Sequence, residues 1–182
     1  VSETLDALSR EVDAGHIVTI GCSNYSTKQL KEALTCSDNH GYQRFEIVQP
    51  PFSLVSREAE KEMFKVCKDQ GIGVVTYSPL AAGLLAGLIS NDRLLPRKGS
   101  RFYIAPDYMN LYFSDRNFRI VEHLRAKSKQ LGIPMARLAM AWVLSNPHIT
   151  AMLIGSDNPE QFNEAIAAYH TEMDLSLIHI CR

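Results

Sequence analysis

Gly71-Ile-Gly-Val-Val-Thr-Tyr-Ser-Pro-Leu-Ala-Ala-Gly-Leu-Leu-Ala-Gly87 combines a short apolar run with a loop of small residues. The run from Gly73 to Thr76 predicts a buried strand that ends at Tyr77-Ser78-Pro79. Four strand-forming residues between glycines are typical of a parallel strand that is covered on both faces. In parallel α/β proteins the chemistry lies just past the carboxyl ends of the strands. Tyr77, Ser78 and the loop around Gly83 occupy that position and are the first candidate site residues.

The composition of the chain indicates which classes of binding partner to expect. The chain has 182 residues, enough for one domain with a core. Nineteen Lys and Arg residues balance twenty Asp and Glu residues, so the chain lacks the excess of positive charge that is typical of proteins that bind nucleic acid or an anionic membrane. The most apolar segment, Pro79 to Ile89, is too short to cross a bilayer. We therefore expect neither a nucleic acid nor a membrane partner, and the oligomeric state stays open.

The cysteines and the two ends of the chain give further expectations. The cysteines at 22, 36, 67 and 181 show no metal-ligand spacing and no dense disulfide framework, which favours free thiols and a cytoplasmic location. The first residues, Val1-Ser-Glu-Thr, are polar and do not begin with methionine, so they do not resemble a signal peptide. We therefore expect Val1 to be an internal position of a longer protein. Residues 175–182 do not fit what precedes them. We interpret them as a non-native tail, with a short apolar strand as the alternative, and assign residues 1–174 to the domain.

Helical and strand-like segments alternate along the chain. Apolar runs predict four strands, at 17–20, 45–48, 73–76 and 151–154. Ser26 with Gln29, and Asn158 with Gln161, match the capping box that begins a helix. Further helices are expected from Leu5 to Gly15, from Ser56 to Gly71, over 115–131 and from Pro134 to Ser145. The segment from Ser90 to Ser114 is expected to be irregular, and its basic and aromatic residues suggest a lid.

The spacing of the predicted strands indicates how they pair. Helical segments separate consecutive strands, so the connections are crossovers and the pairing is expected to be parallel. Two architectures fit this pattern: part of a (β/α)8 barrel, or a small doubly wound sheet that is complete in itself. A full barrel needs roughly 250 residues, so the barrel interpretation implies a part of one.

Four strand-end motifs, in this order, resemble the carboxyl-terminal half of the aldo-keto reductase family. They are Ile20-Gly-Cys-Ser-Asn-Tyr-Ser26, Val48-Gln-Pro-Pro-Phe-Ser-Leu54, Gly71 to Leu80, and Leu153-Ile-Gly-Ser-Asp-Asn-Pro-Glu-Gln161. The segment from Gly132 to Trp142 is similar to the family's helix before its last strand. The resemblance covers about 1–173. It implies an α/β fold, namely the C-terminal half of a (β/α)8 TIM barrel with four parallel strands and flanking helices.

The resemblance also implies a cofactor, usually NADPH, with NADH as the other candidate. Position by position it assigns Ser23, Asn24 and Gln49 to the nicotinamide carboxamide, which short polar side chains suit because it both donates and accepts hydrogen bonds. It assigns Tyr77 to stacking on the nicotinamide ring. The remaining assignments are Ser78, Leu80 and Gly83 for the pyrophosphate, and Gly155, Ser156, Gln161 and Glu164 for the adenosine end.

The sequence departs from the family pattern near the adenosine 2′-phosphate. Many relatives carry Lys or Arg there, whereas these positions are Gly155, Asp157 and Gln161 here. A carboxylate at Asp157 would repel a phosphate, which weakens the expected preference for NADPH. Arg97 or Arg101, from the long segment, would compensate.

The resemblance implies reduction of a small-molecule aldehyde or ketone to an alcohol by the intact protein. The family's Asp, Tyr, Lys and His for proton transfer come from its first four strands, which have no counterpart here. We therefore assign no catalytic residue, expect this part alone to be inactive, and do not assign Tyr77 as the proton donor. The histidines show no metal-ligand spacing. A nicotinamide-binding regulatory subunit, similar to the β subunits of potassium channels, is the alternative.

Four of the assigned residues also have a purely structural explanation. Ser23 and Asn24 would serve as a turn before the helix at Ser26, and Gln49 would simply end a strand before two prolines. Tyr77 would be a strand-end tyrosine at the rim of a core. The position of all of them after predicted strands favours the binding role.

Overall fold

The structure is a computed structural model that describes residues 1–87, 89, 96 and 98–173. The predicted tail at 175–182 lies outside the described residues, as does part of the long segment after residue 87. The described residues fall into two compact units, which are presented separately. Unit 1 comprises Val1–Pro51, Glu58–Tyr77 and His148–Ala151; unit 2 comprises Phe52–Arg57, Ser78–Pro147 and the residues from Met152 onward.

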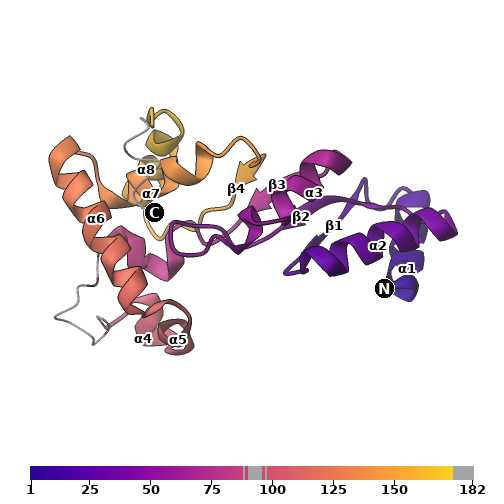
Figure 1. Cartoon of the computed structure of the whole chain (residues 1–182), viewed down its shortest axis with the longest axis horizontal. Helices are drawn as coiled ribbons and strands as arrows, with labels where there is room; N and C mark the ends of the chain where they lie inside the picture. The colour runs from indigo at the N-terminus through magenta and orange to yellow at the C-terminus, as the bar shows by residue number, and fades with distance from the viewer. Residues whose placement is uncertain (88, 90–95, 97, 174–182) are drawn as a thin grey trace. The chain divides into compact units, whose positions relative to one another are not determined.

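Unit 1 alternates strands and helices. Its strands are β1 (Ile20–Ser23), β2 (Phe45–Gln49) and β3 (Gly73–Thr76), and its helices are α1 (Ser2–Asp13), α2 (Thr27–His40), the 3-10 turn η1 (Glu58–Glu60) and α3 (Met63–Gln70). Figure 1 shows the three strands side by side with these helices around them. The short strand β4 (Ala151–Met152) follows β3 in the sheet.

The sheet has the strand order β1-β2-β3-β4, which is the order of the sequence. β1 pairs with β2, and β2 with β3, in parallel. A doubly wound sheet reverses its strand order at the ligand site, whereas a barrel adds its strands consecutively. The consecutive order therefore confirms the expectation of four parallel strands with flanking helices, as in part of an aldo-keto reductase barrel, over the doubly wound alternative.

One face of the sheet is covered and the other is open within unit 1. Ile20, Val48 and Val74 are buried, whereas Gly21 and Ile47 on the opposite face are exposed. The covered side contains large apolar side chains from the helices, among them Leu5, Leu30 and Phe64. The expectation that β3 is covered on both faces is therefore only half fulfilled: Val74 is buried, and Val75 is half-buried.

Local signals fix both ends of α2, and its start is the one expected. The Gln29 amide donates to Ser26 Oγ at 3.2 Å, and the Ser26 amide donates to Gln29 Oε1 at 2.8 Å, which completes the capping box. At the other end Gly41 adopts φ 69°, the left-handed conformation that ends helices and favours glycine. The helix position predicted from the sequence is confirmed.

Three predicted element positions are wrong. The strand expected at 17–20 begins at Ile20, because the His16 and Ile17 amides bond to the Glu11 carbonyl at the end of α1, and Val18 is left 95 % exposed. The helix expected from Ser56 begins at Met63, since Ser56 closes a turn with Ser53 through two backbone hydrogen bonds. The strand expected at 151–154 is limited to Ala151–Met152.

Unit 2 is mainly helical. Its elements are η2 (Ala81–Ala86), α4 (Arg101–Ile104), α5 (Asp107–Tyr112), α6 (Asp115–Leu131), α7 (Met135–Leu144) and α8 (Pro159–Tyr169). The extent of α6 agrees with the predicted helix, and Gly132 ends it with φ 66°. Small residues let α7 and α8 pack closely: Ala141, Ala165 and Ala168 are buried in one cluster. Trp142 is buried and stacks on Phe52 with ring centroids 5.3 Å apart.

The segment expected to be irregular from Ser90 to Ser114 forms two short helices in its described part. Ser100 Oγ accepts from the Tyr103 amide at 3.3 Å and begins α4. Phe102 and Tyr112 are buried, and Phe113 contacts both Phe102 and Phe118. These aromatic side chains form core contacts within unit 2. Residues 90–95 and 97 of the expected lid lie outside the described residues.

Candidate cofactor-binding site

The carboxyl ends of β1, β2 and β3 lie next to one another in unit 1. Ser23 is the register partner of Gln49, and an isolated parallel bridge joins Pro51 to Tyr77. Parallel strands present their carboxyl ends at one edge of a sheet, which is where barrels carry their functional residues. Ser23, Asn24, Gln49 and Tyr77, called here the strand-end cluster, therefore meet at this edge.

Hydrogen bonds connect the members of the strand-end cluster. Ser23 Oγ donates to the Gln49 carbonyl oxygen at 2.8 Å, and Tyr77 Oη donates to Asn24 Oδ1 at 2.7 Å. Asn24 has φ 60°, a left-handed conformation that asparagine tolerates better than most residues. The bond from Tyr77 to Asn24 spans 53 positions of the chain and fixes the direction of the phenol ring.

The free polar groups of the strand-end cluster suit a carboxamide. Asn24 Oδ1 is occupied by Tyr77, but its amide nitrogen keeps its hydrogens for a ligand. Among the described residues the Gln49 side chain has no hydrogen-bond partner, so it can both donate and accept. Tyr77 adds a flat, half-buried ring held in one direction by its hydroxyl. This set of donors, acceptors and a ring fits a nicotinamide.

The loop after β3 belongs to unit 2 and has an unusual backbone. Ser78, Ala81 and Ala82 have φ of 56°, 48° and 57°, and Gly83 has φ 98°. A Cβ atom at Gly83 would meet no atom within 4 Å, so the space beside this backbone is open. The Gly83 amide bonds to the Leu80 carbonyl at 3.0 Å. An open glycine next to small residues suits close approach by a phosphate group.

The start of α8 differs from the expected capping box. Asn158 Oδ1 accepts from the Gln161 amide at 2.9 Å, as predicted. Gln161 Oε1, however, accepts from the Asp157 amide at 2.9 Å, one residue before the position that a capping box requires. Gly155 and Ser156 are exposed just before this helix start. The side-chain nitrogen of Gln161 and the Ser156 hydroxyl remain as donors for a ligand here.

Glu164 is held by a residue that the sequence did not indicate. Arg137 on α7 donates to both carboxylate oxygens of Glu164, with Nε at 2.9 Å and Nη2 at 2.7 Å. These hydrogen bonds, and then the positive charge, hold the pKa of Glu164 below its ordinary value. The two residues are 27 positions apart on different helices, so no spacing rule links them. A carboxylate in this fork stays ionised and has fixed orientation.

Arg101 lies on α4 and is exposed. Its guanidinium is 5.4 Å from the centre of the Tyr108 ring, a distance typical of a cation–π contact. Arg97, the other basic residue considered for a phosphate, lies outside the described residues.

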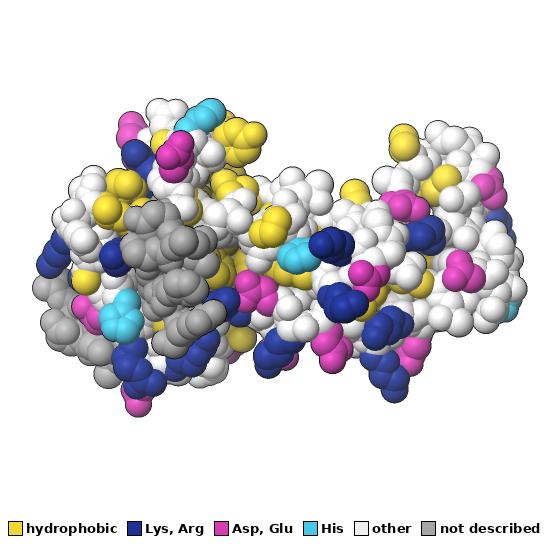
Figure 2. Space-filling model, turned by 45° about the horizontal axis from the view of Figure 1, so that its top comes forward, with side chains coloured by type: hydrophobic (Ala, Val, Ile, Leu, Met, Phe, Trp, Pro, Cys, Tyr) yellow, Lys and Arg dark blue, Asp and Glu magenta, His cyan; other side chains and the backbone are white. Residues whose placement is uncertain are grey.

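Other kinds of site find no support in the described part of the chain. No cluster of three or more His, Cys, Asp and Glu residues that could hold a metal ion occurs among residues 1–87 and 98–173. None of the described helices is both long and apolar enough to span a membrane. Basic side chains stand beside acidic ones over the face shown in Figure 2.

Comparison with known proteins identifies the family. The family model described as Aldo/keto reductase family matches residues 1–181. The chain belongs to the aldo/keto reductase family. The chain is 31% identical over 178 residues to an uncharacterized oxidoreductase of Bacillus subtilis. This match covers 98% of the chain and 52% of that protein.

Two further relatives carry more specific names. The chain is 30% identical to the NADH-specific methylglyoxal reductase of Escherichia coli, over 95% of the chain and 50% of that protein. It is also 31% identical to a probable voltage-gated potassium channel subunit beta of Arabidopsis thaliana, over 92% of the chain and 52% of that protein. This aldo/keto reductase chain thus spans about half the length of the curated relatives it matches.

Proposed function

We propose that the whole protein reduces aldehydes or ketones to alcohols with a nicotinamide dinucleotide as the hydride donor. The observation that carries this proposal is the hydrogen-bonded strand-end cluster at the carboxyl ends of three parallel strands. When the cofactor is bound, it supplies the hydride. Ser23, Asn24 and Gln49 would then hold its carboxamide, and the Tyr77 ring would fix which face of the nicotinamide meets the substrate.

For the rest of the cofactor the proposal rests on the sequence resemblance alone, and the residues that it assigns belong to unit 2. Ser78, Leu80 and Gly83 would contact the pyrophosphate, and Arg101 would add a positive charge. Gly155, Ser156 and Gln161 would contact the adenosine end. Glu164, held ionised by Arg137, would accept a hydrogen bond from the adenine amino group.

NADPH is the expected cofactor, and NADH is the other candidate. Asp157 is exposed and its carboxylate would repel a 2′-phosphate, while Arg137 is already paired with Glu164. The relative that is named an NADH-specific methylglyoxal reductase supports the second candidate. The affinities of the chain for NADPH and for NADH, measured side by side, decide between the two cofactors. The same two affinities are then measured for the Asp157→Asn variant. Relief of repulsion should improve NADPH binding and leave NADH binding unchanged.

A regulatory role is the second candidate function, and the relatives named as potassium channel β subunits favour it. Such a subunit would bind the cofactor and act through a partner protein. If the whole protein turns over a carbonyl substrate at rates far above the rate without the protein, the enzymatic role is favoured. Cofactor binding without turnover would favour the regulatory role.

The test of the proposal is binding of NADPH and NADH to the purified chain by calorimetry. Tyr77→Ala should weaken binding about tenfold or more, since stacking of an aromatic ring on a base contributes roughly 1–3 kcal/mol. Tyr169→Ala, an exposed tyrosine on α8, is the matched control and should have no effect. Absence of binding to both cofactors, or equal affinities of the two variants, would overturn the assignment.

The chain alone is proposed to be inactive, because it contains none of the family's proton-transfer residues in their motifs. A carbonyl-reductase assay on the purified chain should stay at background, and activity above background would contradict this. The cytoplasmic location predicted from the cysteines also remains a proposal. The three described cysteines are free thiols, and fluorescence microscopy of the tagged whole protein would test the location.

A further inference from the structure

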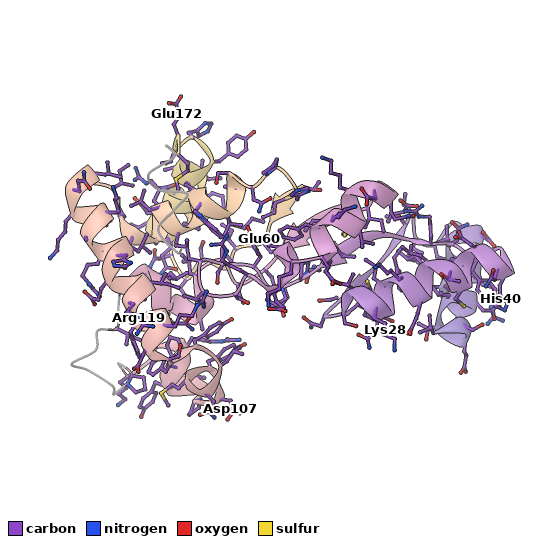
Figure 3. All side chains as sticks on the ribbon, in the orientation of Figure 1. Lys28, His40, Glu60, Asp107, Arg119 and Glu172 are labelled. Carbon is purple, nitrogen blue, oxygen red and sulfur yellow. The ribbon has the colours of Figure 1, made fainter. Side chains whose placement is uncertain are left out.

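A pocket of about 580 Å³ lies along α2 in unit 1, and no residue of the strand-end cluster is among those that line it. Its wall includes Lys28, Glu32, Cys36 and His40, which are spaced by four residues and therefore form one row on the helix. Lys31 lines it from the neighbouring row. Figure 3 labels Lys28 and His40 at the two ends of this row. A thiol, an imidazole and two ammonium groups thus face one open pocket.

Cys22 and Cys36 are both partly exposed, and of the described cysteines Cys36 is the one with an imidazole neighbour. Its Sγ lies 3.8 Å from Nδ1 of His40. Burial raises the pKa of Cys22 and of Cys67 to about 11, so both thiols are protonated at neutral pH. Cys36 is partly exposed and lines the pocket.

The position of His40 determines which ring nitrogen carries a hydrogen. Nδ1 is 2.9 Å from the Cys36 carbonyl oxygen, and a carbonyl can only accept, so Nδ1 carries the hydrogen. The same nitrogen lies 3.8 Å from the Cys36 sulfur, so its N–H is within reach of a negatively charged sulfur formed during a reaction. The ring is kept in this position by parallel stacking on Tyr42, with centroids 5.3 Å apart.

The other pocket residues indicate the chemistry of a reaction partner. A metal ion would need a third ligand beside Cys36 and His40, and the described residues offer no such group of three. Lys28 and Lys31 instead attract an anion, and the contact of Lys28 with the Glu32 carboxylate, at 3.8 Å between exposed side chains, is a long one. Glu62 is also on the wall and is exposed, so the two ammonium groups share the pocket with two carboxylates and would attract an anion locally rather than through a net positive charge.

We propose that Cys36 is a site of reversible S-thiolation by a small anionic disulfide. The Cys36 thiol loses its proton to solvent, and the thiolate attacks one sulfur of the disulfide. A new disulfide bond forms to Cys36 while the bond in the small molecule breaks. The other half leaves as a thiolate and is protonated by water. Cys36 is thereby oxidised and the departing half is reduced, so the exchange needs no further oxidant.

The test uses glutathione disulfide as the probe, on the whole chain with Cys181→Ser, since residue 181 lies outside the described residues. Peptide mass spectrometry should find the glutathione adduct on Cys36, with Cys22 and Cys67 reacting at least tenfold more slowly. His40→Ala should slow the reaction about tenfold, the effect of losing one hydrogen bond to a charged sulfur. A reducing thiol should remove the adduct.

A charge comparison separates the proposed pocket from a merely accessible thiol. Lys28→Gln with Lys31→Gln should slow the reaction with glutathione disulfide several-fold at low salt, but not the reaction with the neutral hydroxyethyl disulfide. Lys68→Gln, an exposed lysine of α3 outside the pocket, is the control and should change neither rate. Preferred reaction at Cys22 or Cys67, no adduct on Cys36, or an unchanged rate in His40→Ala would overturn the proposal.

Discussion

At the scale of single residues, two threonines of unit 1 differ in what their hydroxyl groups do. Thr76 Oγ1 is buried and has no hydrogen-bond partner among the described residues. Thr150 Oγ1 accepts from the Val74 amide at 3.0 Å and so satisfies a backbone donor of β3. A buried polar group without a partner costs free energy, and so does an amide that loses its acceptor.

Thr76→Val is therefore expected to raise the free energy of unfolding by about 1 kcal/mol, since it replaces the unpaired hydroxyl with a methyl group. Thr150→Val is the matched control: the same change should lower it by about 1 kcal/mol, because the Val74 amide loses its partner. Urea denaturation followed by circular dichroism measures both. Destabilisation of the Thr76 variant would show that its hydroxyl has a role in folding.

The ion pair of Glu164 with Arg137 gives a pH dependence with a definite sign. Hydrogen bonds and charge from Arg137 lower the pKa of Glu164 below 4.5 in the folded chain. Its contribution to stability is therefore present above that value and is lost as the pH falls through the lowered pKa. Arg137→Met should move the pKa of Glu164 back up toward 4.5, as measured by carboxyl NMR titration. Arg125→Met, which removes an arginine elsewhere in unit 2, should leave it unchanged.

At the scale of elements, the pairing of β1 with β2 depends on a glycine. A Cβ atom at Gly21 would lie 2.5 Å from the Ile47 carbonyl oxygen, on the neighbouring strand. Gly21→Ala should thus push the two strands apart and destabilise unit 1 by roughly 2–3 kcal/mol. A Cβ at Gly155 would meet no atom within 4 Å, so Gly155→Ala should change stability by less than about 0.5 kcal/mol. Equal urea midpoints of the two variants would contradict the observed register.

The elements that the sequence predicted correctly are those with local signals. The capping box of Ser26 with Gln29 and the left-handed glycines at 41, 71 and 132 act within one turn of the chain, so the sequence shows them directly. The strand expected at 17–20 failed because a strand needs a partner, and backbone bonds at the end of α1 occupy the residues before Ile20. The helices after Ser100 were missed because buried contacts of Phe102 and Phe113 stabilise them.

In the candidate site, too, local motifs could be predicted from the sequence and contacts between distant residues could not. Its residues were found because they follow strands in recognisable motifs, and the structure brings Ser23, Asn24, Gln49 and Tyr77 together in unit 1. The partners of these residues were not predictable, since contacts such as that of Arg137 with Glu164 join distant helices. Whether the assigned residues bind a cofactor stays a prediction for the binding experiments above.

At the scale of the whole molecule, the sheet leaves apolar surface uncovered. Ile47 is 37 % exposed on its open face, and β1 is the first strand in the order, with no further strand beside it among the described residues. Open strand edges and exposed apolar sheet faces promote association between chains. The relatives named above are about twice as long as this chain.

We therefore expect the purified chain to associate, with a sedimentation coefficient that rises with concentration in the micromolar range. Ile47→Thr should shift this equilibrium toward the monomer, because it removes apolar area from the open face while keeping a β-branched residue in β2. Ile104→Thr is the matched control: Ile104 is 70 % exposed on α4 of unit 2 and is not part of the sheet, so its substitution should leave association unchanged. A chain that stays monomeric at all concentrations, with a single cooperative unfolding transition, would mean that the open face is stable in water without a covering partner.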